Sequence, residues 1–148
     1  MDTYYCEELN DRAGSSDHGP RTFSANIAGS ARHNQNFRTV FWTGTNLQMT
    51  LMCISPCGDI GLEVHEDTDQ FIRVEAGVAL VRMGNDKDCL NTQVKLCEGD
   101  GIFVPCGTWH NIISLGHCPL KLSSIYAPPH HPAGTVHRTK ADAERSGY

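Results

Sequence analysis

The chain has 148 residues, of which 39% are hydrophobic and 20% charged, and a formal net charge of −5 at pH 7. A chain of this length is expected to form one domain with its own core. The acidic balance and the lack of a Lys/Arg cluster argue against a nucleic-acid partner. No apolar run is long enough to span a membrane. The polar, acidic N-terminus does not resemble a signal peptide, so we expect a cytoplasmic protein.

Seven cysteines are present, an odd number with no C-x-x-C pair. This pattern is typical of reduced, buried thiols in a cytosolic protein rather than of a disulfide framework. Cys53 and Cys57 are spaced as a strand end and a turn can be, which would suit a thiolate metal site. No second cysteine pair accompanies them, so we favour the first interpretation.

Short runs rich in β-branched, aromatic and apolar residues, separated by turn residues, dominate the chain. They predict strands at 37–43, 47–54, 60–65, 70–75, 78–83, 89–96, 101–104, 108–115 and 120–126. Ala127-Pro128-Pro129 should end the sheet, because proline cannot sit inside a central ladder. Many short strands with almost no helix favour a sandwich or barrel.

The segments that flank the strands are less regular. Residues 1–22 are polar and lack periodicity, so we expect a flexible arm there. Residues 23–31 are expected to form a short helix or a covering segment, and only residues 140–145 look helical near the C-terminus. The expected layout is therefore an arm at 1–22, a barrel with its cover segment at 23–130, and a tail with a short helix at 131–148.

Polar side chains converge in the stretch from Gly58 to Gly77. On a strand over 60–65, Glu63 and His65 share one face because side chains alternate between faces. A turn over 66–69 would fold the next strand back and bring Gln70 near that face. A carboxylate, an imidazole and an amide on two paired strands can form a metal pocket.

A second stretch matches a known pattern. Gly99, Pro105, Gly107 and His110 fit G-x5-P-x-G-x2-H-x3-N, with Ser114 where Asn is usual. This pattern is the second motif of the cupin family, which the chain resembles over roughly residues 37–126. The first motif, G-x5-H-x-H-x3–4-E-x6-G, matches in part.

In that first motif, Gly77 fixes the register. Gln70 then stands where the family has Glu, His65 is the second His, and Glu63 takes the place of the first His. Gly58 is one position off its usual spacing. A rival register pairs His65 with Asp67, which shortens the spacing before Gln70.

The resemblance implies a double-stranded β-helix, an all-β jelly roll with a divalent metal inside. The ligands that it implies are Glu63, His65, Gln70 and His110. Such a mixed N/O set suits Zn, Mn, Fe, Ni or Co and does not select among them. Open coordination positions would remain for water or a substrate, and Glu63 and His110 are the expected catalytic residues.

Two further expectations concern the surface. We interpret the proline-rich segment with His130, His131 and His137 as a solvated loop that can fold over the barrel mouth, as cupin tails often do. Apolar residues on the outer faces need cover, and cupins are often dimers, so we expect a homodimer. The residues placed on these outer faces are Ile60, Leu62, Val64, Trp109, Ile113 and Leu115.

The chain most resembles small cupins grouped with mannose-6-phosphate isomerase. That grouping rests on similarity of fold, so the activity does not transfer with it. Our first hypothesis is an isomerase-like, metal-dependent enzyme acting on a small polar molecule such as a sugar. The fold alone does not fix the reaction. An Fe(II)-type oxygenase and a non-catalytic ligand-binding module are the alternatives. No Arg/Lys pair is clearly aimed inward, since Arg73 lies opposite Gln70, and this argues against a phosphosugar.

Overall fold

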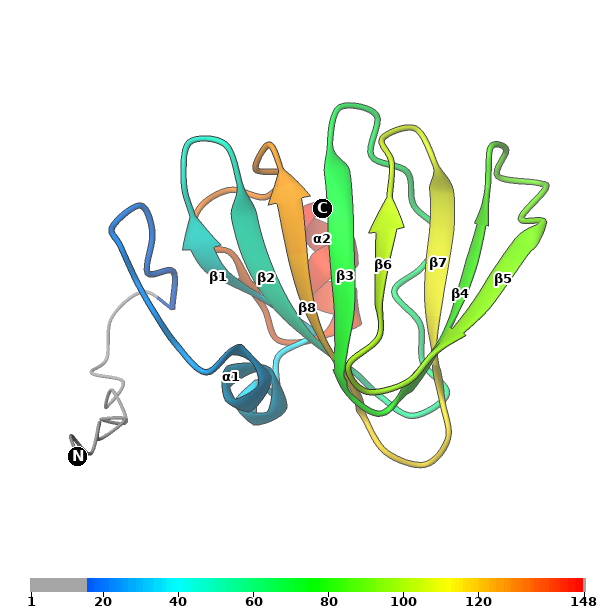
Figure 1. Ribbon diagram of the computed structural model, residues 1–148, viewed down its shortest axis with the longest axis horizontal. Helices are drawn as coiled ribbons and strands as arrows, with labels where there is room; N and C mark the ends of the chain where they lie inside the picture. The colour runs from blue at the N-terminus through cyan, green and yellow to red at the C-terminus, as the bar shows by residue number, and fades with distance from the viewer. Residues whose placement is uncertain (1–15, 148) are drawn as a thin grey trace, which may run out of the picture.

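The computed structural model describes residues 16–147, which form two antiparallel sheets and two short helices (Figure 1). The elements in chain order are α1 (Ile27–His33), β1 (Arg38–Thr43), β2 (Gln48–Ile54), β3 (Asp69–Ala76), β4 (Val78–Gly84), β5 (Thr92–Leu96), β6 (Gly101–Val104), β7 (Trp109–Leu115), β8 (Leu120–Ala127), β9 (Val136–His137) and α2 (Lys140–Ser146).

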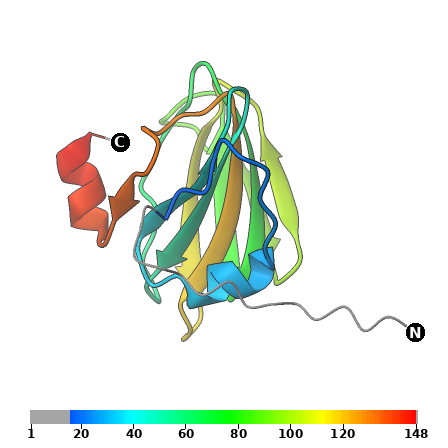
Figure 2. The same cartoon turned by 90° about the vertical axis from the view of Figure 1, so that its left-hand side faces the viewer.

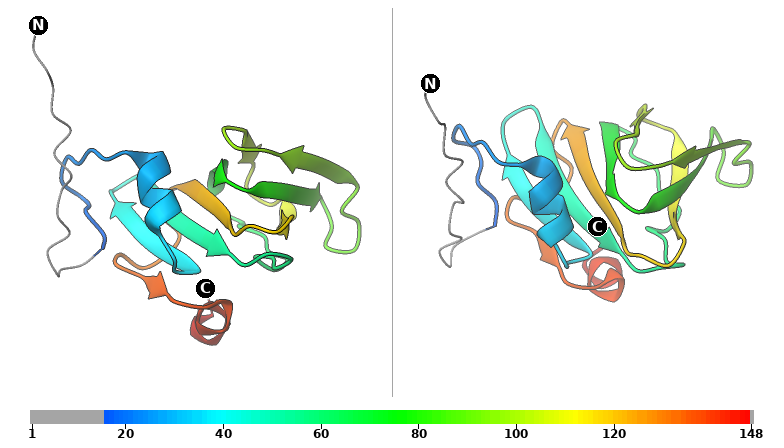
Figure 3. Two further views of the ribbon diagram at one scale, coloured as in Figure 1. Left: turned by 90° about the horizontal axis from the view of Figure 1, so that it is seen from below. Right: turned by 60° about the horizontal axis from the view of Figure 1, so that its bottom comes forward.

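The strand order shows how distant parts of the chain meet. The larger sheet has the order β6-β3-β8-β2-β1-β9, and the smaller one has the order β5-β4-β7. Seen from below, the two sheets lie against each other as the walls of a flattened barrel (Figure 3). This is the all-β jelly roll expected from the many short strands.

The core lies between the two sheets and is built by alternation along the strands. On β8, Leu120 and Leu122 are fully buried, and Ser124 and Tyr126 continue the same inward face. The side chains that form the apolar cluster come from both sheets, and they include Met52, Ile54, Ile72, Val74, Val81 and Ile112. At one end of the barrel the inward positions become polar, and this change marks the end that holds the site.

Gly77 makes the tight turn between β3 and β4 possible. Its φ of +87° lies in the left-handed region, and a Cβ there would come within 3.0 Å of the Pro119 carbonyl oxygen. Only glycine meets both conditions without strain. The residue that fixes the register of the motif therefore has a structural reason to be glycine.

The two helices lie on opposite sides of the larger sheet (Figure 2). The helix α1 packs against β8, β3 and β2, and α2 contributes Ala143 to the core. A capping box closes the start of α2, with the Thr139 side chain accepting from the Asp142 backbone N–H. The expected helices at both ends are confirmed, and no helix among the described residues is long and apolar enough to cross a membrane.

Three sequence-based expectations are wrong. Residues 60–65 do not form a strand, because only isolated bridges hold the segment, from Asp59 to Ile113 and from Glu63 to His110. Ile60 consequently packs against the core and not on an outer face. Within the described residues the thiols are free but not buried, since Cys57, Cys89, Cys97, Cys106 and Cys118 are all exposed and Cys53 is half-buried, and Cys6 lies outside those residues.

The arm expected over residues 1–22 falls partly outside the described residues, which begin at residue 16. Residues 16–22 lie along β1. The backbone N–H of His18 donates to the Phe41 carbonyl, and its ring stacks on Phe23 at a centroid distance of 4.1 Å. The Trp42 indole donates to the Arg21 carbonyl.

Candidate metal centre

Glu63 reaches the site through an irregular segment that follows the edge strand β7. The backbone N–H of Glu63 donates to the His110 carbonyl at 3.0 Å, and the His110 N–H donates back to the Glu63 carbonyl at 2.9 Å. This reciprocal pair is the closely spaced pair of an antiparallel ladder. It sets the two side chains next to each other although the rest of the segment is not a strand.

His110 is held in one tautomer by its own turn. Its Nδ1 lies 2.9 Å from the Thr108 carbonyl oxygen. Since a carbonyl oxygen can only accept, Nδ1 carries the proton and donates it to Thr108. In the neutral ring, Nε2 is then left with a lone pair that points into the barrel, and this is the arrangement of a metal-ligating histidine.

His65 is positioned by the Pro-x-Gly turn of the second motif. The Gly107 N–H donates to the His65 carbonyl at 2.8 Å, and the Cys106 N–H donates to the Asp69 carboxylate at 2.9 Å. Gly107 has a φ of +76°, which favours glycine over any other residue. The two motifs are thus joined at their turns, and His65 and His110 face one point from opposite sides.

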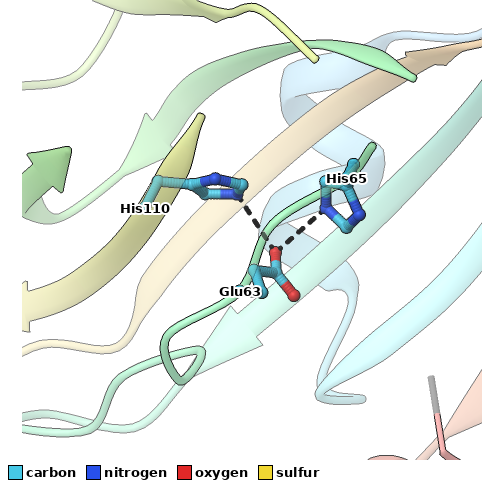
Figure 4. Close-up of side chains that lie close together, drawn as sticks. All are labelled: Glu63, His65 and His110. Atoms are coloured by element: carbon cyan, nitrogen blue, oxygen red, sulfur yellow. Dashed lines mark ion pairs between the residues drawn. The ribbon is translucent and has the colours of Figure 1, made fainter. Parts of the chain in front are cut away.

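Three ligand atoms converge at that point (Figure 4). Glu63 Oε1 lies 3.3 Å from His65 Nε2 and 3.3 Å from His110 Nε2. One ligand atom from each of these three residues lies within 4.8 Å of the others. Among residues 16–147 this is the one such group of His, Cys, Asp and Glu side chains, so a thiolate site at Cys53 and Cys57 is not formed.

The electrostatics of the three side chains favour an ionised Glu63. Burial opposes ionisation of the carboxyl group, but the contacts with His110 and His65 outweigh it and hold the pKa of Glu63 well below its usual range. His110 is fully buried and His65 nearly so. An ionised carboxylate is a hard donor and an imidazole is a borderline donor. Together they suit a divalent transition metal.

The buried nitrogens lack hydrogen-bond partners. Both ring nitrogens of His65 and Nε2 of His110 are buried without one. Leaving buried polar atoms unsatisfied is unfavourable, and native structures do so rarely. A metal ion would satisfy His65 and His110 at once, so the residues present fit a divalent ion.

Gln70 lies on β3 at the same polar end of the barrel, and its side chain is 5% exposed. Its Nε2 donates to Ser124 Oγ at 2.7 Å, which leaves Oε1 buried without a hydrogen-bond partner. The amide is therefore oriented with its oxygen available as a ligand. Asp67, the alternative acid, is exposed in the turn and outside the three-residue group.

Several side-chain contacts near the centre were not predicted from the sequence. The Tyr126 ring meets the His65 ring edge-on at a centroid distance of 5.5 Å, and the His130 ring meets it at a centroid distance of 4.3 Å. His131 is 5% exposed, so its side chain is not solvated as expected, although Pro132, Ala133 and Gly134 after it are exposed. Burial and the nearby Arg38 charge lower the pKa of His131 to about 3, so its ring is neutral at pH 7.

A buried cation was also missed. Arg38 is 3% exposed and pairs with Met52, a core residue, so its side chain starts on the inner face of β1. Its Nη1 lies 3.3 Å from Nδ1 of His137, which is 6% exposed. Arg73 is exposed, as expected. No motif marked Arg38 in the sequence, and burial along β1 does not alternate.

Comparisons with known proteins agree with this fold and centre. The model of the cupin domain matches residues 50–126. The uncharacterised protein YrkC of Bacillus subtilis is 54% identical over 127 residues, covering 86% of this chain and 68% of its own length. The uncharacterised protein L612 of Acanthamoeba polyphaga mimivirus is 37% identical over 128 residues, covering 86% of this chain and 78% of its own.

A solved structure is similar over nearly the whole chain. The crystal structure of BH2720 from Bacillus halodurans superposes with a TM-score of 0.87 at 52% identity, covering 88% of this chain and 98% of that one. The matched region of the family model contains Glu63, His65, Gln70 and His110, the residues brought to the polar end of the barrel. The chain belongs to the cupin family.

Proposed function

We propose that this cupin binds one divalent metal ion through Glu63, His65 and His110 and uses it in an enzymatic reaction on a small polar substrate. One observation supports this proposal more than any other. The Nδ1–H of His110 is bound to the Thr108 carbonyl, so its Nε2 lone pair faces Glu63 Oε1 at 3.3 Å. Two acceptors face each other stably only when a cation lies between them or when the ring is protonated.

When bound, the metal would supply Lewis acidity that polarises a carbonyl or hydroxyl oxygen. The chain supplies the rest. Glu63 stays ionised and holds charge at the centre, and Gln70 presents a neutral oxygen. Burial and the Glu63 charge raise the pKa of Tyr126, so its hydroxyl keeps its proton and can donate a hydrogen bond but not accept a proton from a substrate.

The substrate class rests on the resemblance to isomerase-like cupins and is a small polar molecule of the sugar type. Among the described Arg and Lys side chains, Arg38 alone is buried, and it would suit a polar or anionic group better than an apolar one. A homodimer is part of the proposal, and the exposed Phe103 on β6 supports it.

A second candidate is an oxygenase. Two histidines and one carboxylate, with open positions, are the ligand types of non-haem Fe(II) oxygenases. The observed group of Glu63, His65 and His110 has this composition. Because Gln70 beside this group is neutral, the site has one carboxylate, as the oxygenase candidate requires.

Elemental analysis of protein purified without added metal tests the proposal. We expect about one divalent ion per chain, lost on His110→Ala. Iron together with substrate-dependent oxygen uptake would favour the oxygenase, and zinc or manganese without oxygen uptake would favour the Lewis-acid enzyme. Protein that stays metal-free after incubation with Zn²⁺, Mn²⁺ and Fe²⁺ would contradict both candidates.

A further inference from the structure

The C-terminal segment 128–137, here called the strap, runs beside the candidate metal centre. Its first histidine, His130, places its ring on His65 at a centroid distance of 4.3 Å with the planes inclined by 63°. The same ring stacks on Tyr126 at 5.5 Å. His65 is thereby packed between the strap and the barrel wall.

Prolines leave the first part of the strap with few backbone donors. Pro128, Pro129 and Pro132 have no N–H, so His130 and His131 hold the only backbone donors between Ala127 and Ala133. This part of the strap cannot join a sheet through a regular ladder. Something else must fix its position over the barrel.

Gln48 fixes it with both ends of one amide. Its Oε1 accepts from the backbone N–H of His130 at 3.1 Å and of His131 at 2.9 Å. Its Nε2 donates to the His131 carbonyl at 2.8 Å and to Thr43 Oγ1 at 3.0 Å. The side chain is fully buried, and all four of its hydrogen-bonding positions are used.

The position of Gln48 in the sheet explains why it can do this. It opens β2 and pairs with Tyr126 on β8, and Tyr126 also pairs with Gln70 on β3. Gln48, Tyr126 and Gln70 therefore form one row across three strands at the polar end of the barrel. At one end of the row lies the candidate ligand Gln70. At the other end lies Gln48, whose amide binds the strap.

We propose that Gln48 is a positioning residue of the metal centre, because its amide fixes the strap and thereby seats the His130 ring against His65. This inference rests on the proposed metal-binding function. The ring of His130 restricts the rotation of the His65 side chain, whose two ring nitrogens make no hydrogen bond that would orient it. Packing thus replaces the hydrogen bond that orients a typical metal-binding histidine.

Four variants test the proposal. Gln48→Met keeps the volume and removes the hydrogen bonds that the Gln48 side chain makes to the strap. His130→Ala removes the ring, and His130→Phe keeps a ring of similar size. Leu51→Val is the matched control, since Leu51 lies on the same strand and is buried, but its side chain is on the opposite face from Gln48. The dissociation constant for Zn²⁺ is measured by competition with a chromophoric chelator, and hydrogen exchange is followed at the amides of His130 and His131.

We expect Gln48→Met to accelerate exchange at both amides and to raise the dissociation constant at least about tenfold, as for other residues that orient ligands. His130→Ala should raise it similarly. His130→Phe and Leu51→Val should stay within about threefold of the wild type, the range of minor effects. Absorption of the Co²⁺-loaded protein should keep the wild-type ligand-field bands in His130→Phe.

Several outcomes would overturn the proposal. Fast exchange in Gln48→Met with an unchanged dissociation constant would show that the strap does not position His65, while metal binding itself would stand. Equal losses in His130→Phe and His130→Ala would make His130 a ligand instead. A wild type that binds no metal would refute the proposed function directly. If Gln48→Met does not fold, Gln48→Glu, which keeps the two acceptor contacts, replaces it.

Discussion

At the scale of single residues, Glu63 is the proposed ligand with the clearest charge role. Replacing it by Gln keeps the shape of the side chain but removes the only carboxylate among the three grouped residues. We expect Glu63→Gln to weaken Zn²⁺ binding by about a hundredfold or more, since loss of a charged ligand exceeds the 10–100-fold effect of an outer-shell residue. Isothermal titration measures this.

Glu66→Gln is the matched control for that variant. Glu66 is exposed in the turn three residues later, so the same chemical change there leaves the centre intact. Its Zn²⁺ affinity should equal that of the wild type. Equal weakening by both substitutions would point to a general charge effect and against Glu63 as a ligand.

Gln70 and Asp67 allow a second residue-scale prediction. The Gln70 oxygen is buried without a hydrogen-bond partner, and Asp67 is exposed. Gln70→Ala should therefore weaken metal binding by about tenfold, whereas Asp67→Asn should leave it unchanged. Gln70→Glu should strengthen it, because a carboxylate binds a divalent cation more tightly than an amide. Chelator competition on the three variants checks the order, and a larger loss in Asp67→Asn would restore the rival register.

Side chains that lie in a motif could be predicted from the sequence. Side chains that bind backbone groups far away in the chain could not. Glu63, His65 and His110 were predicted because a fixed spacing and an alternating pattern marked them. Gln48 was missed because its partners are two backbone amides more than 80 residues away in sequence. A contact of that kind leaves no local pattern.

At the scale of elements, the segment before the site shows where periodicity misleads. Residues 60–65 alternate as a strand does, but Gly61 adopts a φ of +91° and interrupts the ladder. Glu63 still reaches the site, since one bridge to His110 is enough to set its position. Alternation correctly placed Glu63 beside the site, but the cause is this one bridge to His110 and not a complete strand.

The same segment is tied to α2 by Asp59, which pairs with Lys140 and accepts from the Asn111 amide. These contacts with Lys140 and Asn111 lower the pKa of Asp59. Both partners of the ion pair are more than a third exposed, so screening by solvent limits the stabilisation that the pair provides. We expect Asp59→Asn to lower the free energy of unfolding by about 0.5 kcal/mol at neutral pH.

The pH dependence of that difference follows from the direction of the pKa shift. A carboxyl group whose folded pKa is depressed stabilises the protein above its unfolded pKa, here 3.8, and loses that effect as the pH falls through the folded pKa. The difference between Asp59→Asn and the wild type should therefore disappear in acid. Urea denaturation across this range measures it, with Asp67→Asn as the control, and a difference that persists in acid would exclude the ion pair as its cause.

At the scale of the whole molecule, the jelly roll was predictable because strand length, turn residues and the second motif all indicated it. The burial of His131 and His137 in the strap was not, because a Pro- and His-rich composition is typical of solvated loops. Burial of His131 and His137 depends on Gln48, Arg38 and the barrel mouth that these residues meet only after folding. Composition describes a segment alone and cannot include such partners.

The outer face of the larger sheet carries exposed apolar side chains. Phe103 is 78% exposed and lies beside Phe71 at a centroid distance of 4.7 Å. Phe71 also pairs with Ile125 on β8, and these residues line a hollow of about 300 Å³. A large aromatic side chain left in water beside other apolar groups is typical of an interaction surface.

We therefore expect a homodimer that buries this face, in place of the outer faces of 60–64 and 109–115 that the sequence suggested. Phe103→Asp should shift the molar mass measured by light scattering from two chains to one, because it puts a charge in an apolar contact. Leu62→Asp is the matched control, since Leu62 is 44% exposed outside this face. A wild type that is monomeric at all concentrations would refute the homodimer. Dissociation by Leu62→Asp but not by Phe103→Asp would place the contact on another face.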